Sequence, residues 1–100
     1  MRVIRSSKFE EDLDYASRYL NEQESELGKY FIDEVEAVIQ SIVESPLTRR
    51  KVYRDIRRMR LRRFKAYSVL YQVLENEGVI QILSVIHGAR DPNRWQDRRL

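Results

Sequence analysis

Cysteine is absent from this sequence of 100 residues, which excludes disulfide bonds and thiolate metal ligands. The single histidine, His87, leaves no second imidazole for a histidine-based metal site or a nucleophilic triad. Three scattered glycines cannot build a glycine-rich phosphate-binding loop. No apolar run reaches the roughly 18–20 residues of a membrane-spanning helix, and the first residues lack the apolar core of a signal peptide. We therefore expect a cytoplasmic protein with no cofactor, no bound metal and no membrane contact.

Positive charge is abundant, and it is concentrated in one stretch. The formal net charge is only +3, but residues 49–65 hold ten basic side chains and one acidic one, whereas residues 1–48 hold five and eleven. Fifteen of the nineteen basic residues are arginine, whose planar guanidinium favours bidentate contacts with phosphate or carboxylate groups. This segregation predicts a polyanionic or acidic partner.

The hydrophobic pattern predicts one α+β domain over residues 1–100, with the order β-α-α-β-β-β. Residues 1–6 favour a strand, and apolar residues at helical spacing over 8–45 predict a helical hairpin. Ser7 and Glu10 fit a capping box at its start, and Pro46 ends it. Residues 56–87 predict a three-stranded antiparallel region, and residues 88–100 a loop and tail. We expect the hairpin to pack on a small, mostly antiparallel sheet.

Within the basic stretch, Met59 and Leu61 alternate with Arg58, Arg60 and Arg62. Alternation in a strand places these three arginines on one exposed face of the sheet, about 7 Å apart. That spacing suits successive phosphates of a nucleic acid or the carboxylates of an acidic protein segment. A charged edge strand that resists aggregation is the alternative. We favour a binding surface.

His87 stands where the last predicted strand meets a loop. Imidazole changes protonation near neutral pH and can act as a general acid or base, although a hydrogen bond that caps the strand end is the commoner role. Tyr67 and Tyr71 share the parity of Val69 and are expected in the core. Trp95 is expected to cover the sheet edge or to anchor a partner. The helical carboxylates show no paired inward spacing, so we expect them on solvated faces.

Two motifs stand in the second half of the chain. Residues 63–71 read RFKAYSVLY, and residues 82–92 read ILSVIHGARDP, with Trp95 following. These segments resemble the R-F-x-x-Y-x-I-x-Y strand and the V-x-H-x-x-R-D-P-x-x-W ending of the RelE/ParE superfamily of type II toxin–antitoxin toxins. The resemblance implies a growth-inhibiting toxin, bound in a hetero-oligomer by a cognate antitoxin that is acidic and partly disordered.

The resemblance covers two mechanisms. The ending is closer to ParE-like members, which inhibit DNA gyrase without chemistry of their own. RelE-like members cleave mRNA on the ribosome, and under that alternative the candidate catalytic residues are Arg62, His87 and Arg90. No tyrosine follows Tyr71, which departs from the RelE-like pattern. A non-toxic module that binds an antitoxin or nucleic acid is a third alternative. The residues expected to contact a partner or nucleic acid are Arg58, Arg60, Arg62, Arg63, Lys65 and Trp95.

Overall fold

The computed structural model describes residues 1–88, which form two helices and five strands. The strands are β1 (Arg2–Arg5), β2 (Lys51–Tyr53), β3 (Ile56–Arg60), β4 (Tyr67–Leu74) and β5 (Val79–His87). The helices are α1 (Ser7–Gln23) and α2 (Leu27–Glu44), and a single 3-10 turn (Glu75–Glu77) precedes β5. The predicted loop and tail over 88–100 lie outside the described residues from position 89 onward.

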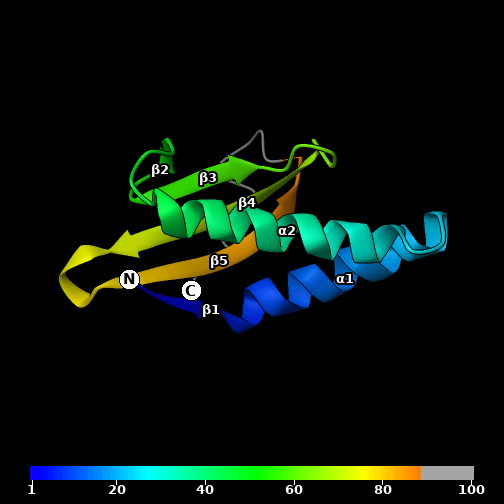
Figure 1. Ribbon diagram of the computed structural model, residues 1–100, viewed down its shortest axis with the longest axis horizontal. Helices are drawn as coiled ribbons and strands as arrows, with labels where there is room; N and C mark the ends of the chain where they lie inside the picture. The colour runs from blue at the N-terminus through cyan, green and yellow to red at the C-terminus, as the bar shows by residue number, and fades with distance from the viewer. Residues whose placement is uncertain (89–100) are drawn as a thin grey trace.

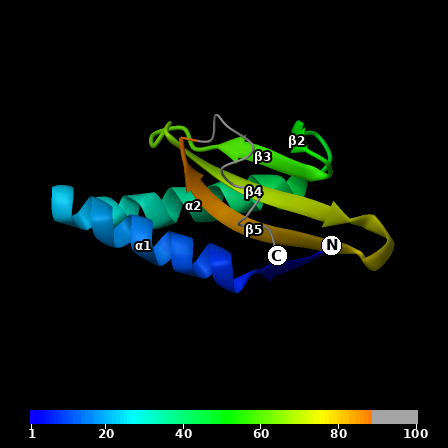
Figure 2. The same ribbon diagram turned by 180° about the vertical axis from the view of Figure 1, so that it is seen from behind.

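The strands form one sheet in the order β1-β5-β4-β3-β2. β1 runs parallel to β5, and the other neighbours are antiparallel. Both helices cover one face of this sheet, and their hairpin extends past its end, as Figures 1 and 2 show from opposite sides. The prediction of a helical hairpin on a mostly antiparallel sheet is confirmed. β2 was not predicted, because three residues are too few for alternation to be visible.

The helices begin and end where local chemistry favours it, with one correction. The N-cap of α1 is Ser6, whose hydroxyl accepts a hydrogen bond from the Phe9 amide at 3.0 Å. The capping box predicted on Ser7 and Glu10 is therefore wrong by one position, because both serines are favourable caps and only the packing of β1 selects between them. α2 ends at Glu44, two residues before Pro46, as expected.

The main core fills the space between the helical hairpin and the sheet. It includes Phe9 from α1, Phe31 from α2 and Tyr71 from β4, all fully buried. Tyr67 is half-buried, and its ring meets that of Phe31 edge-to-face at 4.8 Å. The expectation that Tyr67 and Tyr71 belong to the core is confirmed. A second, smaller cluster lies on the face that carries no described helix, and its buried members are Ile56, Leu70, Leu83 and Ile86.

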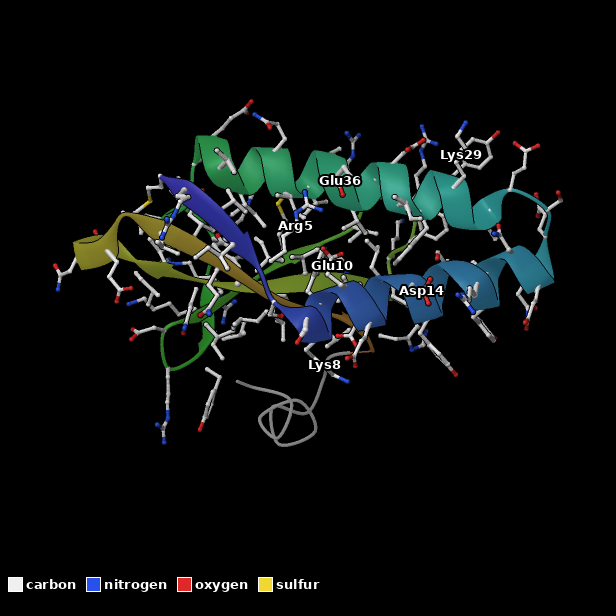
Figure 3. The ribbon with its side chains drawn as sticks, turned by 90° about the horizontal axis from the view of Figure 1, so that it is seen from below. Arg5, Lys8, Glu10, Asp14, Lys29 and Glu36 are labelled. Carbon is white, nitrogen blue, oxygen red and sulfur yellow. The ribbon has the colours of Figure 1, made fainter. Side chains whose placement is uncertain are left out.

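An ion pair ties the edge of the sheet to α2. The Arg5 guanidinium donates to both carboxylate oxygens of Glu36, at 2.7 and 2.6 Å, and lies over the Phe9 ring. Figure 3 shows the two side chains pointing toward one another from β1 and α2. The hydrogen bond from Arg5 holds the pKa of Glu36 below its ordinary value. This carboxylate therefore has a specific partner and does not simply face solvent.

The two helices approach each other closely at Gly28. Its amide donates to the Asn21 side chain at 2.7 Å, and a Cβ at this position would stand 2.2 Å from the Ser17 carbonyl oxygen. Only glycine therefore fits between the helices here. At Gly78 the requirement differs, because its φ of +65° favours glycine while the space around it is open.

We predict that Gly28→Ala destabilises the fold by about 1–3 kcal/mol, since the helices must separate to admit the methyl group. Gly78→Ala should cost only about 1–2 kcal/mol, the penalty of a left-handed backbone conformation. Chemical denaturation measures both values. An unchanged denaturation midpoint for Gly28→Ala would show that the hairpin is not packed this closely.

We predict that Glu36→Gln lowers stability at pH 7 by about 0.5–1 kcal/mol, because both partners of this pair are partly exposed. The folded protein favours the ionised carboxylate, so the stabilisation is complete above the ordinary glutamate pKa of about 4.3. It is lost as the pH falls through the lower pKa of the folded state. Denaturation of both proteins from pH 7 to pH 3 should therefore show the difference vanishing at acid pH, and Glu22→Gln on α1 is the control.

Candidate functional site

A small cationic pocket, the basic pocket, opens where β3, β4 and β5 end on the helix-free face of the sheet. It encloses about 250 Å³. Its lining consists of Arg58, Arg60, Lys65, Ala66, Ser68, His87 and Gly88. None of these described lining residues is acidic. The pocket can therefore accept a phosphate or carboxylate group through several charge-assisted hydrogen bonds.

Strand alternation places the arginines there. Met59 and Leu61 pack into the main core, so Arg58 and Arg60 face the opposite side of β3. In the register of the sheet, Arg60 stands opposite Ser68 of β4. The prediction that these two arginines share a face is confirmed, but only Arg60 is exposed, because Arg58 is half-buried.

The turn after β3 brings Lys65 to the same pocket. The Leu61 amide donates to the Tyr67 carbonyl at 3.0 Å, and the Gly88 amide donates to the Ala66 carbonyl at 2.7 Å. These bonds close the β3–β4 hairpin and join the end of β5 to it. His87 is more than twenty positions from Lys65 in the sequence, and the pairing of β4 with β5 makes them neighbours in the pocket.

Arg62 does not continue the arginine face, which corrects the predicted alternation. β3 ends at Arg60, and the amides of Arg62 and Arg63 both donate to the Glu34 carboxylate of α2. The two arginines line a different concavity, beside Tyr30. The chain turns because Leu61 is buried against the helices, so the residues after it follow α2 and leave the sheet. The structure therefore does not bring Arg62 together with His87.

His87 is the last residue of β5 and is exposed. Its ring meets the Tyr67 ring edge-to-face at 4.9 Å, and Tyr67 is its register partner in β4. Within residues 1–88 no hydrogen bond to this imidazole is found, so the expected strand-capping bond is replaced by ring packing. His87 lines the basic pocket and also the groove on the other side of the sheet end.

Two buried polar side chains, one from α1 and one from its N-cap, hold the end of β5 in place. Neither was identified from the sequence. The Ser6 hydroxyl donates to the Leu83 carbonyl at 2.8 Å, and the Val85 amide donates to the Asp12 carboxylate at 3.3 Å. Asp12 also lies 3.5 Å from the Lys8 ammonium. The expectation that the helical carboxylates are solvated is wrong for Asp12. The one available signal was helical spacing, because position 12 follows the buried Phe9 by three residues and therefore lies on the same inward face of α1.

Arg90 and Trp95, predicted as a catalytic and a partner-binding residue, lie outside the described residues. Within residues 1–88 no cluster of three or more potential metal-ligating side chains occurs. No helix in the same range is both long and apolar enough to span a membrane.

Comparisons of the sequence and of the fold with known proteins both lead to the same group of toxins. A family model described as the ParE toxin of the type II toxin–antitoxin system parDE matches residues 3–92. A solved chromosomal ParDE toxin–antitoxin system from P. aeruginosa is similar with a TM-score of 0.76 at 18% identity, covering 87% of this chain and 95% of that one. The intact E. coli RelBE toxin–antitoxin complex is similar with a TM-score of 0.66 at 17% identity, covering 89% and 98%. No curated protein sequence matches the chain.

Two helices on one face of a five-stranded mixed sheet thus match the fold of the ParE and RelE toxins of type II toxin–antitoxin systems. The family match covers most of the chain. The protein belongs to the ParE toxin family of these systems.

We predict that Glu34→Ala frees the turn after β3, because its carboxylate accepts the amides of Arg62 and Arg63. Losing one hydrogen bond of about 1.4 kcal/mol corresponds to about tenfold faster amide hydrogen exchange at these two positions. Exchange read by nuclear magnetic resonance measures this. Asp33→Asn in the same concavity is the control, and unchanged exchange in Glu34→Ala would contradict the assigned role.

Proposed function

We propose that this protein is a cytoplasmic toxin that inhibits DNA gyrase and is neutralised by a cognate antitoxin. The observation that carries the proposal is the ParE family match over residues 3–92. The neighbouring structures are those of toxin–antitoxin systems, which supports an antitoxin partner. The acidic character proposed for this antitoxin complements the excess of arginine on the toxin, and its partial disorder is what membership of this family implies.

The basic pocket is the surface proposed to contact the target. Arg60 and Lys65 are exposed at its rim, and Arg58 and Ser68 line its wall. Backbone hydrogen bonds close the hairpin that carries these groups, so little backbone entropy is lost when an anionic surface binds. Binding alone accounts for inhibition of this kind, because complementary charge at an interface supplies orientation and specificity. Arg62 and Arg63, which line a separate concavity, and Trp95 remain proposed contacts on the same partner.

A ribosome-dependent mRNA endonuclease is the second candidate, and one observation favours it. His87 lines the same pocket as Arg60 and Lys65. In such a reaction the substrate's 2′-hydroxyl attacks the adjacent phosphorus, the bond to the 5′-oxygen breaks, and a 2′,3′-cyclic phosphate remains. The imidazole would take the hydroxyl proton, a proton would be returned to the leaving oxygen, and the cations would stabilise the charge that develops on phosphate. Arg62 lies away from this pocket, so it is not part of the set.

We predict that the purified protein inhibits the supercoiling activity of gyrase and that Arg60→Glu weakens inhibition about tenfold, because it reverses a charge at the pocket rim. Arg50→Glu makes the same charge change in the basic stretch outside the pocket and should stay within about twofold. A supercoiling assay and a ribosome-primed mRNA cleavage assay, run side by side, provide the measurement.

Cleavage of mRNA within codons that His87→Ala abolishes would assign the protein to the nuclease alternative. A protein with neither activity that still binds its antitoxin would be a non-toxic binding module. Either result would overturn the gyrase proposal.

A further inference from the structure

A groove lined by tyrosines lies between α1 and the ends of β4 and β5, on the side of the sheet that carries the helices. It encloses about 710 Å³. Tyr15 and Tyr19 of α1 line it, together with Tyr67 and His87. We call this the tyrosine groove. It is separate from the main core, because Tyr15 is 76% exposed and Tyr19 is 49% exposed.

The three phenol rings gather at one place. Tyr15, Tyr19 and Tyr67 all line the tyrosine groove. Burial raises the pKa of Tyr67, and the neighbouring Tyr19 and Tyr15 raise it further. The spacing of four residues puts Tyr15 and Tyr19 on the same side of α1. Exposed tyrosines at this spacing contribute little to folding. They offer a large, rigid contact area, which is the usual anchor of a binding partner.

The tyrosine groove and the basic pocket are adjacent. Both are lined by His87, whose ring packs on Tyr67 at the sheet end. A ligand that passes over this pair of rings meets aromatic surface on one side and cations on the other. The two concavities therefore form one composite surface with two different chemistries.

Charge distinguishes a peptide from a nucleic acid on this surface. Glu11 and Asp12 also line the tyrosine groove, and Lys8, on the side of α1 turned away from α2 in Figure 3, pairs with Asp12. The exposed Glu11 carboxylate would repel a phosphate backbone that leaves the basic pocket. A peptide meets no such penalty, since it can place a neutral side chain in the groove and a carboxylate in the pocket.

We infer that this composite surface binds an extended acidic segment of a partner protein. An aromatic or large aliphatic side chain of the segment fills the tyrosine groove beside Tyr15 and Tyr19. An aspartate or glutamate nearby in the same segment enters the basic pocket and contacts Arg60 and Lys65. The inference rests on the proposed function, in which this partner is the antitoxin.

The test selects ligands without knowledge of the antitoxin. A phage-displayed library of random dodecapeptides is panned on the purified full chain, and fluorescence anisotropy measures the affinity of the selected peptides. We expect sequences that combine aspartate or glutamate with tryptophan, tyrosine, phenylalanine or leucine. Tyr15→Ala and Arg60→Glu should each weaken these peptides about tenfold, as loss of an anchoring contact does.

Matched variants separate this result from misfolding and from general charge effects. Tyr30→Ala removes another exposed tyrosine, on α2, and Arg50→Glu reverses another exposed arginine; both should leave affinity within about twofold. Circular dichroism checks that every variant is folded. The peptide assay contains neither gyrase nor ribosomes. A negative peptide result would therefore not contradict a positive gyrase or ribosome assay, and negative gyrase and ribosome assays would not contradict a positive peptide result.

Five results would overturn the inference. Panning could fail to enrich acidic sequences. The enriched peptides could also bind the Tyr15→Ala variant as tightly as the unchanged protein. A dodecanucleotide of thymidine or uridine could bind and weaken with both Tyr15→Ala and Arg60→Glu, which would give the surface to nucleic acid. Self-association that Tyr15→Ala abolishes would give it to a second copy. Peptide affinity that rises about tenfold in Trp95→Ala would give it to the chain's own C-terminal residues.

Discussion

The second half of β5 has a strand partner on one side only, and the start of α1 supplies the partner on the other. β1 pairs with β5 no further than Ile82, and Leu83 forms a bulge opposite β4. At and beyond this point Ser6 and Asp12 take the place of a strand by bonding to the backbone of Leu83 and Val85. A buried peptide group left without a partner costs about 1–3 kcal/mol, so these bonds determine the path of β5 to its end.

This arrangement explains why two binding surfaces meet at His87. Because a helix and not a strand flanks the end of β5, side chains of α1 stand beside Tyr67 and form the tyrosine groove. On the opposite face, the β3–β4 hairpin carries Arg60 and Lys65 to the same sheet end. The fold thereby presents an acidic-aromatic surface and a cationic surface side by side. The two surfaces therefore differ in chemistry although His87 belongs to both.

Much of the fold could be predicted from periodicity, because the core side chains repeat every two or every three to four residues. The two helices, the order of the long strands along the chain and the shared face of Arg58 and Arg60 followed from that pattern. Arg62 continued the same alternation in the sequence, yet the strand ends at Arg60 because burial of Leu61 against the helices turns the chain. Two adjacent serines were equally good helix caps, and packing selected Ser6.

Composition, periodicity and short motifs are sufficient to predict the fold class, the family and the concentration of positive charge. Which charges act together depends on the tertiary structure. It separates Arg62 and Arg63 from Arg58 and Arg60, buries Asp12 against β5, and brings Tyr15 and Tyr19 beside a histidine about seventy positions away. Contacts between distant residues depend on which backbone groups need hydrogen-bond partners and on the register of the strands. Neither can be read from a local sequence pattern.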